Sequence, residues 1–290
     1  MTRIACRSFA WALLLALLGL QATPLAAQPR GNRLMPRYVT VGPPDQAEGA
    51  RVLEEFRQLG VAGDYYLDFV LEVLPRRGAR WQVPGRLWGS RDENGPVSRL
   101  AITPAAPAPV QRWLVRSGPA AAAWRSAEGA AVSPVSPGEL LAPLAGTTAT
   151  LFDLQMPFVQ WRDFVFEGVA KIRGRTAHAF LLYPRAEFAS AYPSIGGVRI
   201  YLDMQFHALM QAVVLDTAEQ PWRTMTVIDL KKVGEQWIPK SIDFRDERTR
   251  DKTRFRVTGA ALNAEFSSAL FRSDSLRDTI APPPGVVRID

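Results

Sequence analysis

A chain of 290 residues with 22% charged side chains and a formal net charge of +7 is long enough to form one large domain. Its Lys and Arg residues are spread over the sequence without a basic helix or an aromatic-basic motif, which argues against nucleic-acid binding. The single cysteine is Cys6, so the chain beyond it contains no disulfide bond, thiolate metal site or cysteine nucleophile.

Residues 1–27 have the pattern of a signal peptide. Arg3 and Arg7 precede an apolar run over 10–20, and a stretch of small residues ends at Ala27. The apolar run is too short for a membrane-spanning helix, although an N-terminal membrane anchor is the alternative interpretation. We expect cleavage near Ala27, a soluble periplasmic protein, and no transmembrane segment after cleavage.

Residues 28–44 are rich in Pro and Gly and are expected to form a flexible N-terminal arm. A helix is predicted over Asp45–Leu59, because Asp45 can cap its first turn and the apolar residues that follow form one stripe. Apolar and polar residues alternate in the next part of the chain, which predicts strands. These strands are expected at Asp64–Leu74, Trp81–Ser90, Val97–Thr103, Val110–Arg116 and Ala121–Arg125.

The segment 128–146 is rich in Pro, Ala and Gly and has no periodicity, so we expect it to cross the open side of the sheet. The apolar segment Thr148–Trp161 comes next. Thr148 or Thr150 can cap this segment and Pro157 interrupts it, which predicts one or two short helices.

The second half of the chain returns to the alternation of strands. The predicted strands begin at Phe164 and continue through Ala177–Tyr183, Val198–Leu202 and Ala208–Asp216 to three strands joined by charged turns in 222–276. The tail over 277–290 contains consecutive prolines and is expected to be extended.

The complete pattern predicts one mainly β (α+β) domain over 45–276. We expect a single curved antiparallel sheet whose concave apolar face is covered by helices. An outer-membrane barrel is the rival architecture, but the helical segments and the Pro-rich insert argue against it.

Residues able to carry covalent chemistry are sparse. His178 lies in a predicted strand among apolar residues and is expected to be a partly buried core histidine, whereas His207 is expected to be exposed in a turn. Asp246, Glu247 and Asp251 alternate with basic residues in a hairpin turn, where exposed ion pairs are the usual outcome. The spacing of these residues matches no metal-binding or catalytic motif, so we expect no metal, no cofactor and no enzymatic activity.

Apolar surface is abundant, with eight Trp and fourteen Phe residues. Part of it must form a core, and the rest is interpreted as a cavity between the strands and the Leu151–Trp161 segment. Burial of an acyl chain stabilises a complex by about 0.8 kcal/mol per CH2 and needs no catalytic residue. A cavity for one fatty chain is therefore consistent with the absence of catalytic motifs.

Three parts of the sequence carry a resemblance to a known family. They are 153–168 (DLQMPFVQWRDFVFEG), 174–184 (GRTAHAFLLYP) and the closing strands over 222–276, with a Lys-Val-Gly turn and a Trp-Ile-Pro-Lys strand start. In this order they resemble the LolA/LolB-like family, the periplasmic carriers that sort outer-membrane lipoproteins. The resemblance implies an open half-barrel with a helical lid over a lipid-binding cavity, and membrane-associated donor and acceptor proteins as partners. It also implies a lid-locking arginine, for which Arg57 and Arg162 are among the candidates.

The sequence therefore predicts a periplasmic, non-catalytic carrier for the acyl chains of lipids or lipoproteins. An envelope interaction or lipid-sensing protein that uses the same fold without transport is the alternative, and a hydrolase that depends on His178 is a third hypothesis. The predicted cavity wall consists of Leu67, Phe69, Leu71, Phe164, Phe166, Ile200, Leu202, Val227, Ile242 and Phe244. The predicted lid consists of Leu151, Phe152, Leu154, Met156, Phe158 and Trp161.

Overall fold

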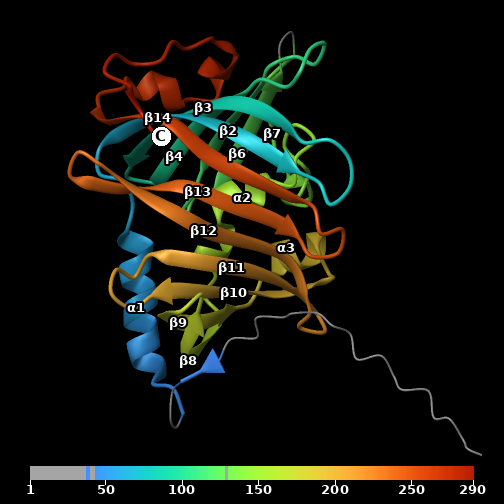
Figure 1. Ribbon diagram of the computed structural model, residues 1–290, viewed down its shortest axis with the longest axis vertical. Helices are drawn as coiled ribbons and strands as arrows, with labels where there is room; N and C mark the ends of the chain where they lie inside the picture. The colour runs from blue at the N-terminus through green and yellow to red at the C-terminus, as the bar shows by residue number, and fades with distance from the viewer. Residues whose placement is uncertain (1–36, 40–42, 128–129) are drawn as a thin grey trace, which may run out of the picture. The chain divides into compact units, whose positions relative to one another are not determined.

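Strands dominate the computed structural model, which describes residues 37–39, 43–127 and 130–290 (Figure 1). In the first half they are β1 (Arg37–Tyr38), β2 (Asp64–Leu74), β3 (Trp81–Asp92), β4 (Gly95–Ile102), β5 (Gln111–Arg116), β6 (Ala122–Ala127) and β7 (Ser133–Pro134). In the second half they are β8 (Phe164–Ile172), β9 (Arg175–Leu182), β10 (Ile195–Asp203), β11 (Leu209–Asp216), β12 (Pro221–Val233), β13 (Gln236–Asp246), β14 (Lys252–Ala264) and β15 (Val287–Arg288). The expected signal peptide lies outside the described residues.

All these strands belong to one antiparallel sheet, so the predicted fold class is confirmed. Their order is β1-β8-β9-β10-β11-β12-β13-β14-β2-β3-β4-β5-β6-β7, with β15 paired to β14. Neighbouring strands are mostly consecutive in the sequence, and the main exception is the pairing of β14 with β2. The two edge strands, β1 and β7, are not paired with each other, so the sheet is open.

Short helices occupy the connections between strands. The α-helices are α1 (Gln46–Gln58), α2 (Leu151–Gln155) and α3 (Ala186–Ala191), and the 3-10 helices are η1 (Pro137–Glu139), η2 (Pro157–Gln160), η3 (Ser268–Phe271) and η4 (Asp274–Arg277). We call the segment Pro137–Trp161, which contains η1, α2 and η2, the helical cover. Part of the arm expected to be flexible over 28–44 is ordered, because Arg37–Tyr38 pairs with β8 as an edge strand.

Helix α1 packs closely against β8. Its first turn is capped by Asp45, whose Oδ1 accepts a hydrogen bond from the Ala47 amide at 2.9 Å. The Gln46 side chain bonds to both the N–H and the C=O of Phe166, at 2.9 and 2.8 Å. A Cβ atom added at Gly49 would lie 2.4 Å from the Cβ of Phe166, so only glycine permits this approach. The helix is thereby fixed to one side of the sheet.

One face of the sheet forms a large apolar core with α1 and the helical cover. The cluster combines strand residues such as Phe69, Phe180 and Ile200 with Leu53 of α1 and Phe152 of α2. Because strand side chains alternate between faces, most of the apolar positions predicted from the period of two lie in this core or pack against it. The covered face is the one that the sequence analysis expected to be concave and apolar.

The other face of β2–β6 is covered by the C-terminal segment 265–290. Phe271 and Leu276 of this segment are buried against Tyr66, Trp88 and Leu114. The tail expected to be extended over 277–290 is partly in the sheet. Strand β13 pairs with β14 only through Ser241–Arg245. The edge of β14 is therefore free at Gly259 and Ala260, where β15 pairs with it.

Candidate ligand-binding pocket

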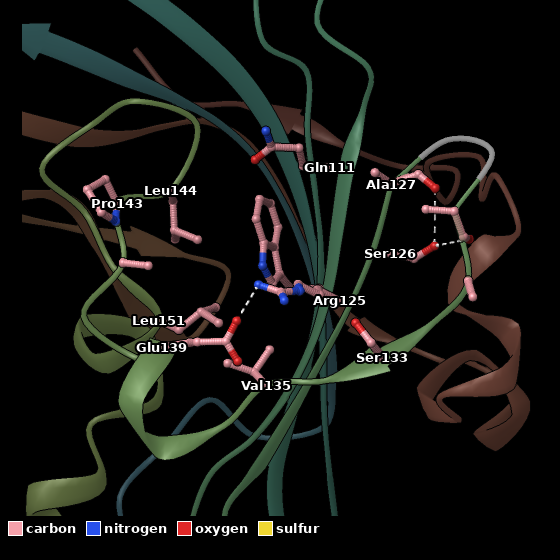
Figure 2. Close-up of a pocket in the computed structure, with 14 residues that line it drawn as sticks. Gln111, Arg125, Ser126, Ala127, Ser133, Val135, Glu139, Pro143, Leu144 and Leu151 are labelled. Atoms are coloured by element: carbon pink, nitrogen blue, oxygen red, sulfur yellow. Dashed lines mark hydrogen bonds and ion pairs between the residues drawn. The ribbon is translucent and has the colours of Figure 1, made fainter. Parts of the chain in front are cut away.

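A pocket of about 350 Å3 lies between β5–β6 and the helical cover (Figure 2). Its apolar walls come from Trp113 of β5, Val135, and Leu144 and Leu151 of the cover. The remaining lining residues are Gln111, Arg125, Ser126, Ala127, Ala130, Ala131, Ser133, Glu139, Ala142 and Pro143. The volume is at the low end of the roughly 300–1,000 Å3 typical of small-molecule pockets. The lining combines apolar residues with polar and charged ones.

An ion pair connects the two sides of this pocket. The Nη1 of Arg125 on β6 lies 2.7 Å from Oε1 of Glu139 in η1, and both side chains are substantially exposed. Glu139 also accepts hydrogen bonds from the N–H and hydroxyl of Ser136, and these bonds, with Arg125, lower its pKa. Exposed ion pairs contribute little to stability, so this contact holds η1 to the strand only weakly.

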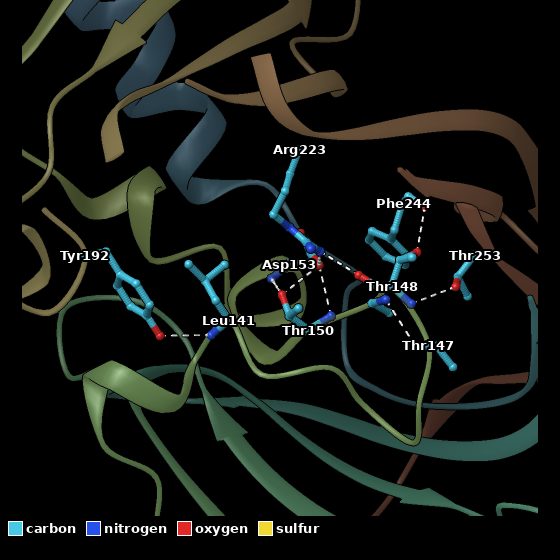
Figure 3. A network of polar contacts seen from close by, with 10 residues as sticks. Leu141, Thr147, Thr148, Thr150, Asp153, Tyr192, Arg223, Phe244 and Thr253 are labelled. Carbon is cyan, nitrogen blue, oxygen red and sulfur yellow. Dashed lines mark hydrogen bonds and ion pairs between the residues drawn. The ribbon is translucent and has the colours of Figure 1, made fainter. Parts of the chain in front are cut away.

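A buried polar network fixes the middle of the cover (Figure 3). Oδ2 of Asp153 accepts hydrogen bonds from the N–H and hydroxyl of Thr150, at 2.9 and 2.7 Å, which caps α2. The same oxygen lies 2.8 Å from Nη2 of Arg223 on β12, and both side chains are buried. Arg223 also donates to the carbonyl of Thr148, whose own N–H donates to the hydroxyl of Thr253 on β14.

Arg57 supplies a second attachment at the end of the cover. Its Nε donates to the carbonyl of Val159 at 2.9 Å, and its Nη2 donates to the carbonyl of Trp161 at 3.1 Å. Arg57 is among the candidates for the lid-locking arginine, and Arg162, another of them, is exposed. Sequence reasoning missed Arg223, although this residue is in phase with the buried Met225 on β12 and an arginine at an inward position signals a buried charge.

An aromatic layer packs the cover onto α3. Phe188 of α3 lies 5.2 Å from Phe152 and 5.3 Å from Trp161, measured between ring centroids, and 4.9 Å from Tyr192. The hydroxyl of Tyr192 accepts a hydrogen bond from the N–H of Leu141 at 3.1 Å. Helix α3 therefore packs against the cover, a role that the sequence analysis did not anticipate.

The structure places most of the predicted lid and wall residues in one apolar core. In the main core cluster lie Leu67, Phe69, Leu71, Leu151, Phe152, Phe158, Trp161, Phe166, Ile200, Leu202 and Phe244. Partly buried against it are Leu154, Met156, Phe164 and Ile242, and Val227 is half-buried. Leu151 lines the pocket of Figure 2, and the other predicted wall and lid residues do not. Their role as a ligand cavity stays a prediction.

The two histidines lie together on the α1 side of the sheet, away from the pocket lining. His178 is buried as predicted, 5.7 Å from the ring of Phe166 and 5.9 Å from that of His207. His207 is half-buried rather than exposed, because its Nδ1 lies 2.8 Å from Oε2 of Glu55 on α1. Among the described residues no group of three His, Cys, Asp or Glu side chains is placed to hold a metal ion.

The environment of His178 predicts a loss of stability in mild acid. Burial, and secondarily the neighbouring His207, lower the pKa of His178, while Glu48 opposes and Arg51 adds to this effect. The pKa of a histidine in an unfolded chain is about 6.5. Below that pH the unfolded chain binds a proton that the folded chain does not bind. We expect the free energy of unfolding to fall as the pH drops below about 6.5.

Urea unfolding over a pH series checks this prediction with the variant His178→Phe. The variant is expected to lose less stability than the native protein between neutral pH and about pH 5.5, above the range in which ordinary carboxylates titrate. Identical losses in both proteins would assign the acid sensitivity to other groups.

The fold is similar to that of solved structures that include a LolA superfamily protein. A domain named for outer-membrane lipoprotein sorting from Vibrio parahaemolyticus superposes with a TM-score of 0.70 at 15% identity, over 81% of this chain and 100% of that one. A DUF1329 family protein from Desulfovibrio piger gives a TM-score of 0.69 at 14% identity, over 79% of this chain and 98% of that one. A LolA superfamily protein from Nitrosomonas europaea gives 0.60 at 13% identity, over 78% and 98%.

A family model described as an uncharacterized protein matches residues 130–278, slightly more than half of the chain. The chain belongs to this family. No curated protein matches its sequence. Within the described part of the chain, no helix combines the length and the apolar character that crossing a bilayer requires.

Proposed function

We propose that this protein is a periplasmic, non-catalytic carrier that binds the acyl chains of lipids or lipoproteins between the sheet and the helical cover. The observation that carries the proposal is the pocket of about 350 Å3 beside the apolar side chains of Leu144 and Leu151 in the cover. The signal-peptide pattern of residues 1–27 and the fold shared with a domain named for lipoprotein sorting support it. Membrane-associated donor and acceptor proteins would be its partners.

A long acyl chain needs more room than the pocket, so binding would require the cover to separate from the sheet. The predicted wall and lid residues would then line the enlarged cavity. Apolar packing between them is non-directional, so an acyl chain can replace it at about 0.8 kcal/mol per buried CH2. The directional contacts are the buried pair of Asp153 with Arg223 and the two bonds of Arg57, and these would set the resistance to opening.

Binding of cis-parinaric acid, a fluorescent fatty acid, tests the proposal. We expect saturable binding that weakens about tenfold in the variant Ala127→Phe, because the larger ring fills a position that lines the pocket. The matched control is Ala218→Phe, which places the same ring at an exposed residue between β11 and β12. Native mass spectrometry of protein purified from the envelope should also detect bound lipid.

Absence of both saturable binding and co-purified lipid would favour the alternative, an envelope interaction or lipid-sensing protein without transport. One observation supports that alternative: most of the predicted wall and lid residues belong to one apolar core. A hydrolase that depends on His178 is less consistent with the structure, because this side chain does not line the pocket and packs against Phe166 instead.

A further inference from the structure

Two hairpin turns lie side by side at one end of the sheet (Figure 1, right). The first, over 75–80, connects β2 to β3, and the second, over 247–251, connects β13 to β14. The N–H of Arg76 donates to Oδ1 of Asp251 at 2.8 Å, and Lys252 is opposite Leu74 in the register. Together the turns form one continuous surface, which we call the basic end.

Positive charge prevails at this end. Its basic residues are Arg76, Arg77, Arg80, Arg248, Arg250 and Lys252, and its acidic residues are Asp246, Glu247 and Asp251. The acids are already engaged, since Asp246 and Asp251 accept backbone N–H groups of the turns and Glu247 lies near Arg245 and Arg250.

The arginines of the first turn are the unusual part of this surface. Arg76, Arg77 and Arg80 are exposed, and in the described chain no acidic side chain forms an ion pair with any of them. Exposed guanidinium groups without an acidic partner in one turn are suited to bind phosphate, which each can contact with two parallel hydrogen bonds.

A tryptophan accompanies these arginines. Trp81 follows Arg80 directly and is 46% exposed at the start of β3. Tryptophan favours the boundary between lipid headgroups and hydrocarbon, where its ring is apolar and its N–H stays hydrated. Among the described residues, the other strongly exposed tryptophan is Trp237. It differs because the lysine opposite it, Lys232, is paired with Glu235 at 3.1 Å.

We propose that the basic end docks this protein on the surface of a membrane that contains anionic phospholipids. Arg76, Arg77 and Arg80 contact lipid phosphates, and Trp81 inserts at headgroup depth. The complementary charge of the bilayer and the aromatic side chain beside the unpaired arginines favour a lipid surface over an acidic protein. The inference is independent of the acyl-binding pocket, which lies at β5–β6.

Vesicle sedimentation tests the proposal on protein purified from the envelope, with its N-terminus verified by mass spectrometry. The vesicles consist of phosphatidylcholine with or without phosphatidylglycerol. Binding is expected only with phosphatidylglycerol, and it should weaken as salt screens the charges. Changing Arg76, Arg77 and Arg80 together to Gln should weaken binding on the order of 100-fold at low salt, and Trp81→Ala should weaken it severalfold.

Matched variants separate a docking surface from a general effect of charge. Changing the exposed Lys231, Arg277 and Arg288 together to Gln removes the same charge elsewhere, and Trp237→Ala removes the other exposed tryptophan of the described chain. Both controls should bind like the native protein. No binding to anionic vesicles, or equal losses in the test and control variants, would overturn the proposal. Fatty-acid binding is measured on the same variants. Loss of vesicle binding with unchanged fatty-acid binding concerns the docking surface alone and not the carrier function.

Discussion

Replacing Arg223 by methionine is expected to lower the free energy of unfolding by about 3–5 kcal/mol, the usual effect of removing one partner from a buried ion pair. The change leaves the carboxylate of Asp153 buried with only Thr150 as a hydrogen-bond donor. The carbonyl of Thr148 also loses its donor. Urea unfolding followed by tryptophan fluorescence measures the loss.

The double variant Arg223→Met with Asp153→Asn is the control. The neutral amide can still accept the bonds from Thr150 and carries no buried charge, so the double variant should recover a large part of the stability. If the single and double variants are equally unstable, packing of the arginine side chain rather than the charge pair holds the cover. The single variant should also bind fatty acid faster if the cover must open for binding.

Arg99→Met is expected to cost about 3 kcal/mol and to release the C-terminal segment 265–290 from the sheet. Arg99 is 2% exposed, and burial lowers its pKa. Its guanidinium donates to the carbonyls of Leu270, Ser275 and Asp278 and to the hydroxyl of Ser275. Methionine has no hydrogen-bond donor for these buried acceptors. They can be hydrated only if the segment separates from β4.

Limited proteolysis should detect this separation as early cleavage within 265–290, and denaturant unfolding gives the stability. Arg112→Met is the matched control, because Arg112 donates to the hydroxyl of Thr279 in the same segment from a half-buried position. Its expected effect is below about 1 kcal/mol. Cleavage at equal rates in both variants would show that apolar contacts alone hold the segment.

Local signals in the sequence predicted much of this fold. The Asp45 cap and apolar stripe gave α1 nearly its observed bounds, and the alternation over Asp64–Leu74 matches β2 residue for residue. Both signals depend only on neighbouring residues. The pairing of β14 with β2 joins distant parts of the chain, and no local pattern reports it. Helix α3 has only six residues, too few for a clear periodicity.

The candidate site was less predictable. Alternation identified apolar residues that are indeed buried, but it cannot tell a filled core from a cavity. The pocket is lined largely from 125–144, where the sequence has few periodic signals and where tertiary contacts decide the conformation. Arg223 was missed because its role depends on Asp153, a partner on another element. The tail over 277–290 was expected to be extended on the basis of its prolines, and no local pattern reported the pairing of β15 with β14.

The close contact of Gly49 with Phe166 makes the mechanics of the domain asymmetric. On that side, α1 is seated on β8 without space between backbone and ring, and Arg57 joins the same helix to the end of the cover. On the other side, η1 is held to β6 by the exposed pair of Arg125 and Glu139. The domain is therefore more rigid on the side of α1 and β8 than on the side of η1 and β6. We expect an apolar ligand to enter and leave past β6.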